Sequence, residues 1–368
     1  QGVSSAASDV YKRQIEGQYM VAGQVALKAM GVVGIPVTNV ENACASSSTA
    51  LNAAHLYVAS GAGDICLAVG VDKLYAEDKA KSFAVFDGAW DVHDAPAQMA
   101  RLMALAPDIT PPPGFEEPGK RSVFMDIYAS LARLHMKTFG TTQRQLAAVA
   151  AKNHMHSTRN SLAQFQYPLT IEEALAARPV SWPLTLPMCA PISDGAAAAI
   201  VCNAQGLKRL REARAVRLYA SVLRTATDRP ADRYDRHLCH LAALEAYERA
   251  GVGPQDMSLA EVHDATAFAE IQQTEALGFC AFGEGGPMAE SGATSLGGRI
   301  PINVSGGLLS RGHPIGATGL AQVHEMVIQL RGQAGARQVD GARFAIAENG
   351  GGFNGVEEAV TCITLLGH

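Results

Sequence analysis

The chain has 368 residues, of which 48% are hydrophobic and 18% are charged, and its formal net charge at pH 7 is −5. This length suffices for two or more core-forming units of an ordinary soluble globular protein, and the net negative charge argues against a nucleic-acid surface. The seven cysteines are scattered and form no Cys-x-x-Cys pair, which predicts reduced thiols in a cytoplasmic compartment. No run of 18 apolar residues and no secretion signal is recognisable, so we expect neither a membrane span nor export.

The first 72 residues begin an α/β pattern. Residues 1–14 are polar and lack periodicity, and we expect them to be a tag or artefactual segment outside the fold. Residues 15–30 have a helical pattern, and residues 35–40 are a short strand candidate. The continuous apolar run 65–71 is typical of a strand buried on both faces of a sheet.

Between these strand candidates, Cys44 stands among small residues at the start of an apolar, alanine-rich helix. The hydroxyls of residues 46–49 are suited to capping the first turn of that helix. Unpaired N–H groups at a helix N-terminus favour a thiolate, so we expect this position to lower the pKa of Cys44 and make it nucleophilic. The alternative is that Cys44 is simply a small buried residue, as free cysteines often are.

Residues 73–188 differ in character from the sequence on either side. Helical patterns joined by proline-rich turns predict an inserted helical layer, or lid, over the sheet, with helices at 123–139, 142–155 and 171–177. Residues 189–213 then return to buried-strand composition and complete the first half. Residues 214–368 are expected to form a second half, with strands at 216–223, 259–264, 344–347 and 360–366 and helices at 238–250, 267–277 and 320–330.

The last third contains two candidate histidines. His313 lies in a glycine-dense loop before a helix, and His263 ends a strand candidate. Taken alone, each histidine is more often structural, but so many glycines in one loop imply close approach of the backbone to something. A cysteine nucleophile needs a base and oxyanion donors within reach. Because Cys44 and His313 both precede helices in similar α/β halves, we expect them to meet at one seam.

Four separated motifs are similar to those of the thiolase superfamily and occur in the same order. They are NACASSS (residues 42–48), VHD (262–264), NVSGG followed by GHPIGATG (303–319) and GGG (350–352). The resemblance covers roughly residues 20–368. The branch it resembles is that of sterol-carrier-protein-type thiolases and bacterial lipid-transfer-protein-like acetyl-CoA acyltransferases.

This resemblance implies an α/β thiolase fold, in which two similar βαβαβ halves carry an inserted helical loop domain over a pocket for acyl-CoA thioesters. It further implies a homodimer, with coenzyme A as a co-substrate and with neither a permanently bound cofactor nor a metal. The expected halves are residues 15–72 with 189–213, and residues 214–368, and the insertion is 73–188. Because thiolases usually have a further strand and helix before the cysteine motif, we expect the first half to be truncated.

The resemblance also implies a role for each motif. Cys44 would accept the acyl group, His313 would take its proton, and His263 would hold a water or donate to the thioester oxygen. The backbone N–H groups of Cys44 and Gly350 would form an oxyanion hole. The substrate-binding residues expected in the third motif are Ser305 and Gly306.

The chain departs from the thiolase pattern where a second cysteine is expected, either before the terminal glycines or directly after His-Asp. These positions are Glu348 and Ala265, which puts the carbon–carbon step in question. One hypothesis is that Glu348, desolvated enough to raise its pKa, supplies the missing acid or base. The alternative is a structural carboxylate that backbone donors satisfy.

Three functions remain open at this point. The leading interpretation is an acyl-CoA C-acyltransferase that cleaves or forms 3-oxoacyl-CoA through an acyl-enzyme on Cys44. A retro-aldolase would not need an acyl-cysteine, and a scaffold or acyl-CoA-binding subunit would need no catalysis. The branch resembles chains that pair with small zinc-ribbon/OB-fold proteins, so such a partner is a further expectation. The presence of both Cys44 and His313 favours the acyl-enzyme.

Overall fold

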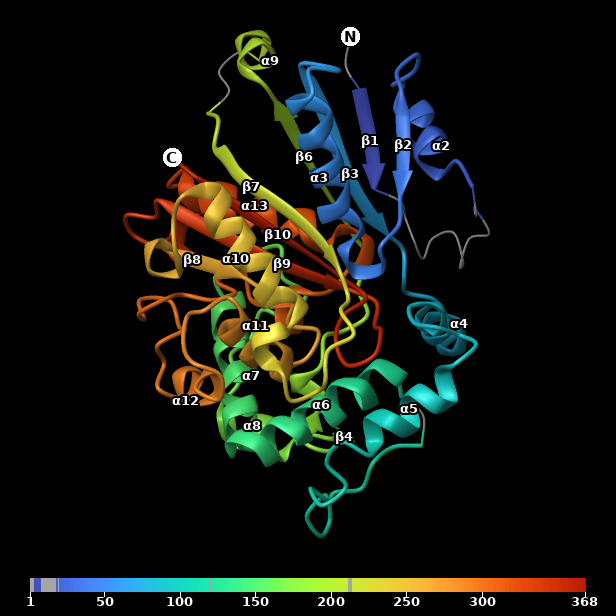
Figure 1. The fold of residues 1–368 in the computed structure, drawn as a ribbon, viewed down its shortest axis with the longest axis vertical. Coiled ribbons are helices and arrows are strands. Elements are labelled where there is room, and N and C mark those ends of the chain that lie inside the picture. The colour runs from blue at the N-terminus through green and yellow to red at the C-terminus, as the bar shows by residue number, and fades with distance from the viewer. Residues whose placement is uncertain (1–2, 8–17, 19, 120, 211–213) are drawn as a thin grey trace.

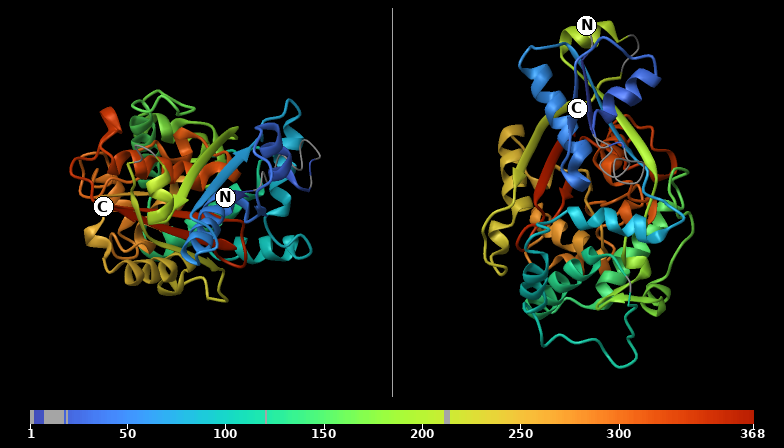
Figure 2. Two further views of the ribbon diagram at one scale, coloured as in Figure 1. Left: turned by 90° about the horizontal axis from the view of Figure 1, so that it is seen from above. Right: turned by 90° about the vertical axis from the view of Figure 1, so that its right-hand side faces the viewer.

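Two four-stranded sheets and a helical segment make up this chain, for which a computed structural model describes residues 3–7, 18, 20–119, 121–210 and 214–368. In Figure 1 the first sheet is at the top, the second lies in the middle, and helices α5, α6 and α8 lie below. The side view in Figure 2 shows the same order along the long axis. Strands and helices alternate through much of both halves, which agrees with the α/β class predicted from the sequence.

The first sheet is mixed, with β1 parallel to both neighbours and β6 antiparallel to β3. Its strand order is β2 (Val37–Val40), β1 (Val3–Ala7), β3 (Ile65–Asp72) and β6 (Gly195–Cys202). The helices of this half are α2 (Ala22–Ala29), α3 (Ser46–Ala59) and α9 (Ala204–Arg209). The expectation that residues 1–14 lie outside the fold is wrong for Val3–Ala7, because their backbone pairs with two strands; residues 1–2 and 8–14 lie outside the described residues.

The second sheet is also mixed, since β10 is antiparallel to β7 and β9, whereas β8 is parallel to β9. Its strand order is β7 (Arg217–Thr225), β10 (Val360–Gly367), β9 (Phe344–Gly351) and β8 (Leu259–Glu261). The helices of this half are α10 (Leu238–Ala250), α11 (Ala267–Ala276), α12 (Gly285–Glu290) and α13 (Thr318–Leu330). Strand β9 continues four residues beyond the expected end at Ala347, through the first two terminal glycines.

The segment between β3 and β6 is helical, with a short hairpin. Its elements are α4 (Lys79–Ala84), α5 (Ala95–Met103), α6 (Val123–Phe139), α7 (Gln143–Ser157), α8 (Ile171–Ala176), β4 (Pro179–Ser181) and β5 (Leu184–Thr185). Helices α6 and α7 share a hydrophobic core with α11 of the second half, which includes Ile127, Leu146 and Phe268. The segment is therefore packed firmly onto the second half.

The two halves meet along α3 and α13, which contact each other. A Cβ atom at Gly319 would overlap the Ser48 hydroxyl, and one at Gly70 would overlap the Gly316 carbonyl. The N–H of Gly316 donates to the Asp72 carboxylate at 2.7 Å. The many glycines of this loop led us to expect a close approach of its backbone to another group. At Gly316 and Gly319 that group belongs to the other half of the fold.

Short helical turns complete the described chain. They are η1 (Ala43–Ala45), η2 (Val85–Gly88), η3 (Leu186–Met188), η4 (Tyr234–Arg236), η5 (Pro254–Asp256), the π-helical η6 (Gly307–Arg311), η7 (Ile315–Ala317) and η8 (Gly335–Arg337). Within the described ranges, every helix is too short or too polar to cross a membrane.

Candidate active site

Cys44 is presented by a tight turn between β2 and α3. It lies in η1, where Ala43 has a φ of +46°, a conformation that L-residues rarely adopt. The N-cap of α3 is Ala45, without a side-chain cap. The expected capping by residues 46–49 is wrong in this respect, since the Ser46 hydroxyl donates backwards to the Ala43 carbonyl at 2.6 Å. That bond tightens the turn that holds the thiol.

Three reactive side chains converge at this turn. The sulfur of Cys44 and one ring nitrogen each of His263 and His313 all lie within 4.8 Å of one another. The two imidazole centroids are 5.2 Å apart, with the rings inclined at 67°. In the described part of the chain, this is the one such cluster of three or more His, Cys, Asp or Glu side chains. Cysteine and histidine also bind zinc, and three ligands fall short of a closed structural zinc site but equal the number found in catalytic ones.

The three side chains line a cavity of about 240 Å³ between the helical segment and the second half. Most of its wall is apolar. The apolar side chains that line it include Leu74, Phe86, Phe124 and Ala265. Tyr128 and Cys189 add a hydroxyl and a second thiol, and Arg121 and Arg178 add positive charge. A cavity of this composition suits an apolar molecule with one polar end.

His313 is held in one tautomer by its neighbour Thr318. The Thr318 hydroxyl lies 2.6 Å from Nδ1 of His313 and donates its single proton to the Pro314 carbonyl at 3.0 Å. It must therefore accept from Nδ1–H, which leaves the lone pair on Nε2. Burial, and then the nearby His263 and Arg311, hold the pKa of His313 well below its usual range. The ring is neutral and can accept a proton.

His263 lies fully within the protein, and neither of its ring nitrogens has a hydrogen-bond partner among the described residues. Burial lowers its pKa to about 4. A neutral imidazole carries one N–H donor, and a buried donor without a partner costs free energy. The ring is therefore placed to donate to a molecule in the cavity.

The pKa of Cys44 is raised to about 12, mainly by burial and then by the negative charge of Asp72. The expected lowering by the helix N-terminus is thus wrong in sign, because desolvation of the thiolate outweighs the N–H groups that favour it. Cys44 is a thiol at neutral pH. It needs a base to become a nucleophile, and Nε2 of His313 is a neutral acceptor beside it.

The sequence led us to expect an oxyanion hole of Cys44 and Gly350, whereas the glycine whose N–H lies at the Cys44 sulfur is Gly352. The N–H of Gly352 bonds toward the Cys44 sulfur. Gly350 lies inside β9, where it pairs with Thr361 of β10. Strand β9 pairs with β10 through Gly351. Gly352 is therefore the first residue after the strand, and it lines the cavity.

Glu348 does not line the cavity but lies behind His263. One carboxylate oxygen accepts the His263 backbone N–H at 3.0 Å, and the other accepts the Thr361 hydroxyl at 3.0 Å. Burial, together with the nearby Glu358, raises its pKa to about 8. The raised pKa matches the sequence hypothesis, but the contacts match its structural alternative.

Ser305 and Gly306 also lie away from the cavity. The N–H and hydroxyl of Ser305 both donate to the Glu261 carboxylate, at 3.0 and 2.6 Å. A Cβ atom at Gly306 would come within 2.6 Å of the Ser157 side chain. The expected substrate contact is therefore not seen; these residues fix the loop that leads to His313.

Tyr128, Cys189 and Thr318 are cavity or supporting residues that were not expected from the sequence. Tyr128 follows Phe124 at the i+4 spacing of a helix face, which indicates only a core residue. Thr318 lies inside the recognised motif GHPIGATG, but a hydroxyl at that position does not by itself predict a hydrogen bond to His313.

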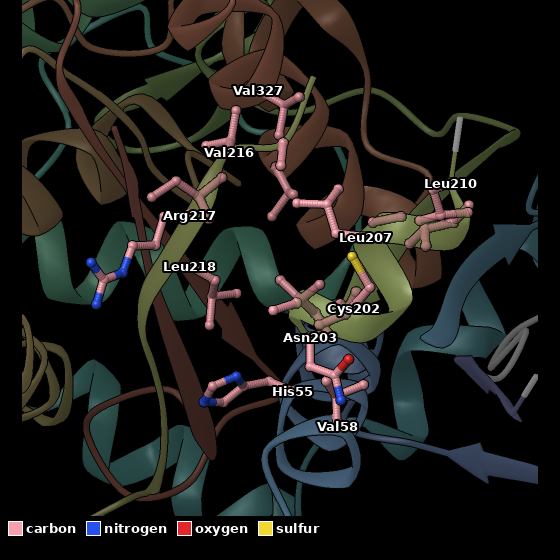
Figure 3. Close-up of a pocket in the computed structure, with 18 of the residues that line it drawn as sticks. His55, Val58, Cys202, Asn203, Leu207, Leu210, Val216, Arg217, Leu218 and Val327 are labelled. Carbon is pink, nitrogen blue, oxygen red and sulfur yellow. The ribbon is translucent and has the colours of Figure 1, made fainter. Parts of the chain in front are cut away.

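A second and larger cavity, of about 1480 Å³, lies between β6, β7, α3 and α13. Figure 3 shows His55, Cys202, Leu207 and Leu218 around it. None of the candidate residues lines this cavity. The smaller cavity at Cys44 is therefore the candidate active site.

Family comparisons agree with this geometry. The family described as "Thiolase, N-terminal domain" matches residues 4–174, and "Thiolase C-terminal domain-like" matches residues 229–364. The acetyl-CoA acetyltransferase of Methanothermobacter thermautotrophicus is 40% identical over 329 residues, which are 88% of this chain and 79% of that protein. Benzoylsuccinyl-CoA thiolase subunit BbsB of Thauera aromatica is 35% identical over 324 residues, covering 87% and 78%.

Sterol carrier protein 2 of Rattus norvegicus is 36% identical over 330 residues, or 87% of this chain but only 57% of that protein. Among solved structures, the Ltp2-ChsH2(DUF35) aldolase superposes with a TM-score of 0.74 at 20% identity, and human mitochondrial 3-ketoacyl-CoA thiolase with 0.64 at 15%. Each covers 100% of this chain and 86% of the other. The chain therefore belongs to the thiolase superfamily and has the thiolase fold.

Proposed function

We propose that this chain is an acyl-CoA C-acyltransferase that cleaves or forms 3-oxoacyl-CoA through an acyl-enzyme on Cys44. The observation that supports this most is the convergence of the Cys44 sulfur with ring nitrogens of His263 and His313 in one buried cavity. A thiol with a raised pKa beside a neutral, oriented imidazole is the pair that nucleophilic acyl transfer requires.

In the cleavage direction, Nε2 of His313 takes the Cys44 proton as the sulfur attacks the 3-keto carbon. The backbone N–H groups of Cys44 and Gly352, which bond toward the Cys44 sulfur, are the donors that we assign to the oxygen that becomes negative in that step. The bond between C2 and C3 then breaks, its electron pair forms the enolate of acetyl-CoA, and the N–H of His263 stabilises the enolate oxygen. The thiol of coenzyme A finally attacks the acyl-Cys44 carbonyl, returning a proton to the cysteine and releasing the shortened thioester.

The cavity wall favours an apolar acyl chain with an anionic carrier at its mouth. Arg121 forms ion pairs with Glu117 and Asp126, at 2.8 and 2.6 Å. Arg178 is exposed and lines the cavity, and it has no ion-pair partner among the described residues. Arg178 is thus the guanidinium available to a phosphate of coenzyme A.

The organisation around this site follows from the same proposal. Strands β3 and β6 pair in one sheet although the helical segment separates them in sequence, which supports the division into residues 15–72, 73–188, 189–213 and 214–368. A homodimer is part of the proposal, as is a small zinc-ribbon/OB-fold partner. One structural relative carries two protein names, Ltp2-ChsH2(DUF35), which supports a second subunit.

A retro-aldolase is the second candidate. It is favoured by the replacement of both second-cysteine positions by Ala265 and Glu348, neither of which brings a thiol. This activity would leave no acyl group on Cys44, so the two candidates differ in a covalent intermediate.

Intact-protein mass spectrometry after incubation with acetyl-CoA, and separately with acetoacetyl-CoA, tests the proposal. We expect an acetyl adduct that Cys44→Ala abolishes. Cys202→Ala is the matched control, because Cys202 is half-buried and lines the other cavity. Folded protein without an adduct from either thioester would contradict the acyl-enzyme and favour the retro-aldolase or a non-catalytic subunit.

A further inference from the structure

Cleavage of a 3-oxoacyl thioester leaves an enolate whose carbon must receive a proton. Cys44 and His313 are engaged with the other carbon of the broken bond, and the N–H of His263 is engaged with the enolate oxygen. Glu348 is behind the wall, with both oxygens bonded. The donor must therefore be sought among the remaining polar side chains that line the cavity.

Tyr128 is a polar side chain of the cavity wall whose hydroxyl no described residue engages. It comes from the first turns of α6, is 3% exposed, and lines the cavity together with Cys44 and His263. Its hydroxyl has no hydrogen bond to any described residue, whereas the hydroxyl of the similarly buried Tyr247 donates to the Leu277 carbonyl at 3.0 Å. A tyrosine hydroxyl inside a protein usually finds a partner. That of Tyr128 is available to a molecule in the cavity.

We propose that Tyr128 is a catalytic acid, which delivers its hydroxyl proton to the enolate carbon released by cleavage at Cys44. This rests on the proposed function and names the proton donor that its carbon–carbon step lacks. It places the donor on the helical segment, in the same cavity as the nucleophile, and at neither of the two positions where the thiolase pattern would put a second cysteine.

The step balances without any further reactant. The pair of electrons from the C2–C3 bond returns from the enolate to C2 and takes the Tyr128 proton, which gives the methyl group of acetyl-CoA and a tyrosinate. The protonated His313 carries the proton that Cys44 lost, and it restores Tyr128 directly or through water. Nothing is oxidised or reduced, and the reverse sequence removes a methyl proton in the forming direction.

The surroundings keep Tyr128 in its protonated form until it is needed. Burial is the largest cause that raises its pKa, followed by the charges of Glu358, Cys44 and Glu348. A phenol of high pKa still transfers a proton readily to an enolate carbon, which is far more basic.

Cys189 is the competing donor on the same wall. Its backbone bridges to Thr266, beside Ala265, but its thiol is directed to the Thr185 carbonyl at 3.5 Å. Burial raises the pKa of the Cys189 thiol to about 12. Since this thiol already has an acceptor in the protein, Tyr128 is the better-placed group.

The test separates the carbon–carbon step from acyl transfer. Tyr128→Phe removes one hydroxyl, with Tyr247→Phe as the control of the same chemistry outside the cavity. We expect thiolysis of acetoacetyl-CoA to fall about 100-fold in Tyr128→Phe, and enzyme-catalysed exchange of acetyl-CoA methyl protons with deuterated water to fall in parallel. Acetylation of Cys44 by acetyl-CoA, which breaks no carbon–carbon bond, should stay within about twofold.

Each outcome bears on the inference. Unchanged thiolysis in Tyr128→Phe would overturn the role of Tyr128 while leaving the acyl-enzyme intact. Equal losses of thiolysis and acetylation would also overturn it, because they indicate a structural role. A wild-type protein that never acetylates Cys44 overturns the proposed function first, and the inference with it. Should Tyr128→Phe fail to fold, 3-fluorotyrosine at position 128 keeps the hydroxyl and makes it more acidic; a pH profile of thiolysis that does not move would contradict the proposal.

Discussion

The carboxylate of Glu348 holds His263 from behind, accepting its backbone N–H at 3.0 Å while the imidazole faces the cavity. This carboxyl group thus supports one of the two imidazole rings of the candidate site. Burial raises the pKa of Glu348 to about 8, so this support is a neutral acid in the folded protein at pH 7.

The first prediction concerns stability as a function of pH. An ordinary glutamate has a pKa near 4.5, and folding raises that of Glu348 to about 8. The folded state therefore binds more protons between these values, and stability is lost as pH rises through this window. Glu348→Gln removes the titration, so its melting temperature relative to wild type should rise between pH 5.5 and pH 8.5. Parallel melting temperatures across that range would contradict the raised pKa.

The second prediction concerns the tautomer of His313. Thr318→Val removes the acceptor of Nδ1–H and allows the lone pair to move away from Cys44. We expect acetylation of Cys44 to slow about 10- to 100-fold, with Thr318→Ser restoring most of the rate. Intact-mass time courses measure both, and a Thr318→Ser variant as slow as Thr318→Val would refute the role of the hydroxyl.

The third prediction concerns the thiol itself. Because burial raises the pKa of Cys44 to about 12, its alkylation by iodoacetamide should still be increasing with pH beyond pH 10. In the unfolded protein the rate should level off near the ordinary thiol pKa, about 8.5 to 9. Peptide mass spectrometry resolves Cys44 from the other cysteines. A plateau of the alkylation rate near pH 8 in the folded protein would contradict the raised pKa of Cys44.

The fourth prediction concerns the anionic end of the substrate. Arg178→Ala should raise the KM for acetyl-CoA about tenfold, roughly the strength of one exposed guanidinium–phosphate contact, with little change in kcat. Arg101→Ala is the control, since Arg101 is exposed but pairs with Asp94 and does not line the cavity. Equal KM values for wild type and Arg178→Ala would place the phosphates elsewhere.

The fifth prediction concerns the contact between β9 and the Cys44 turn. A Cβ atom at Gly351 would overlap the Asn42 carbonyl and lie 2.7 Å from the Ala45 nitrogen. We expect Gly351→Ala to destabilise the protein by about 2–4 kcal/mol and to abolish acetylation. A Cβ atom at Gly355 meets nothing within 4 Å, so Gly355→Ala carries only the strain of the +65° φ at that residue and should cost about 1–2 kcal/mol. Denaturant unfolding measures both, and equal losses would contradict the contact.

Sequence periodicity predicted much of the fold, because capping residues in the sequence mark where many helices begin and end. Helix α6 begins after Ser122, whose hydroxyl accepts the Phe124 N–H, and ends at Gly140 with a φ of +79°. Residues adjacent in sequence determine both ends of this helix, and the expected range 123–139 was correct. Helix α10, which ends at Gly251 with a φ of +68°, behaves in the same way.

The candidate site was only partly predictable. The sequence indicated that Cys44 and His313 would meet, since motifs mark both. It could not indicate Gly352 in place of Gly350, because that depends on how far β9 pairs with β10. Nor could it show that burial of Cys44 outweighs the helix N-terminus, or that Tyr128 of a distant helix would line the same cavity as the thiol, since both depend on packing between segments far apart in the chain.

The seam between the halves sets the order in which reactivity can arise during synthesis. Cys44 leaves the ribosome early, with no base beside it, and the contacts of Gly316 with Asp72 and of Gly319 with Ser48 bring His313 to it only after most of the chain has been made. The proposed acetylation of Cys44 therefore requires that both halves of the fold are packed against each other, and it would report on that packing.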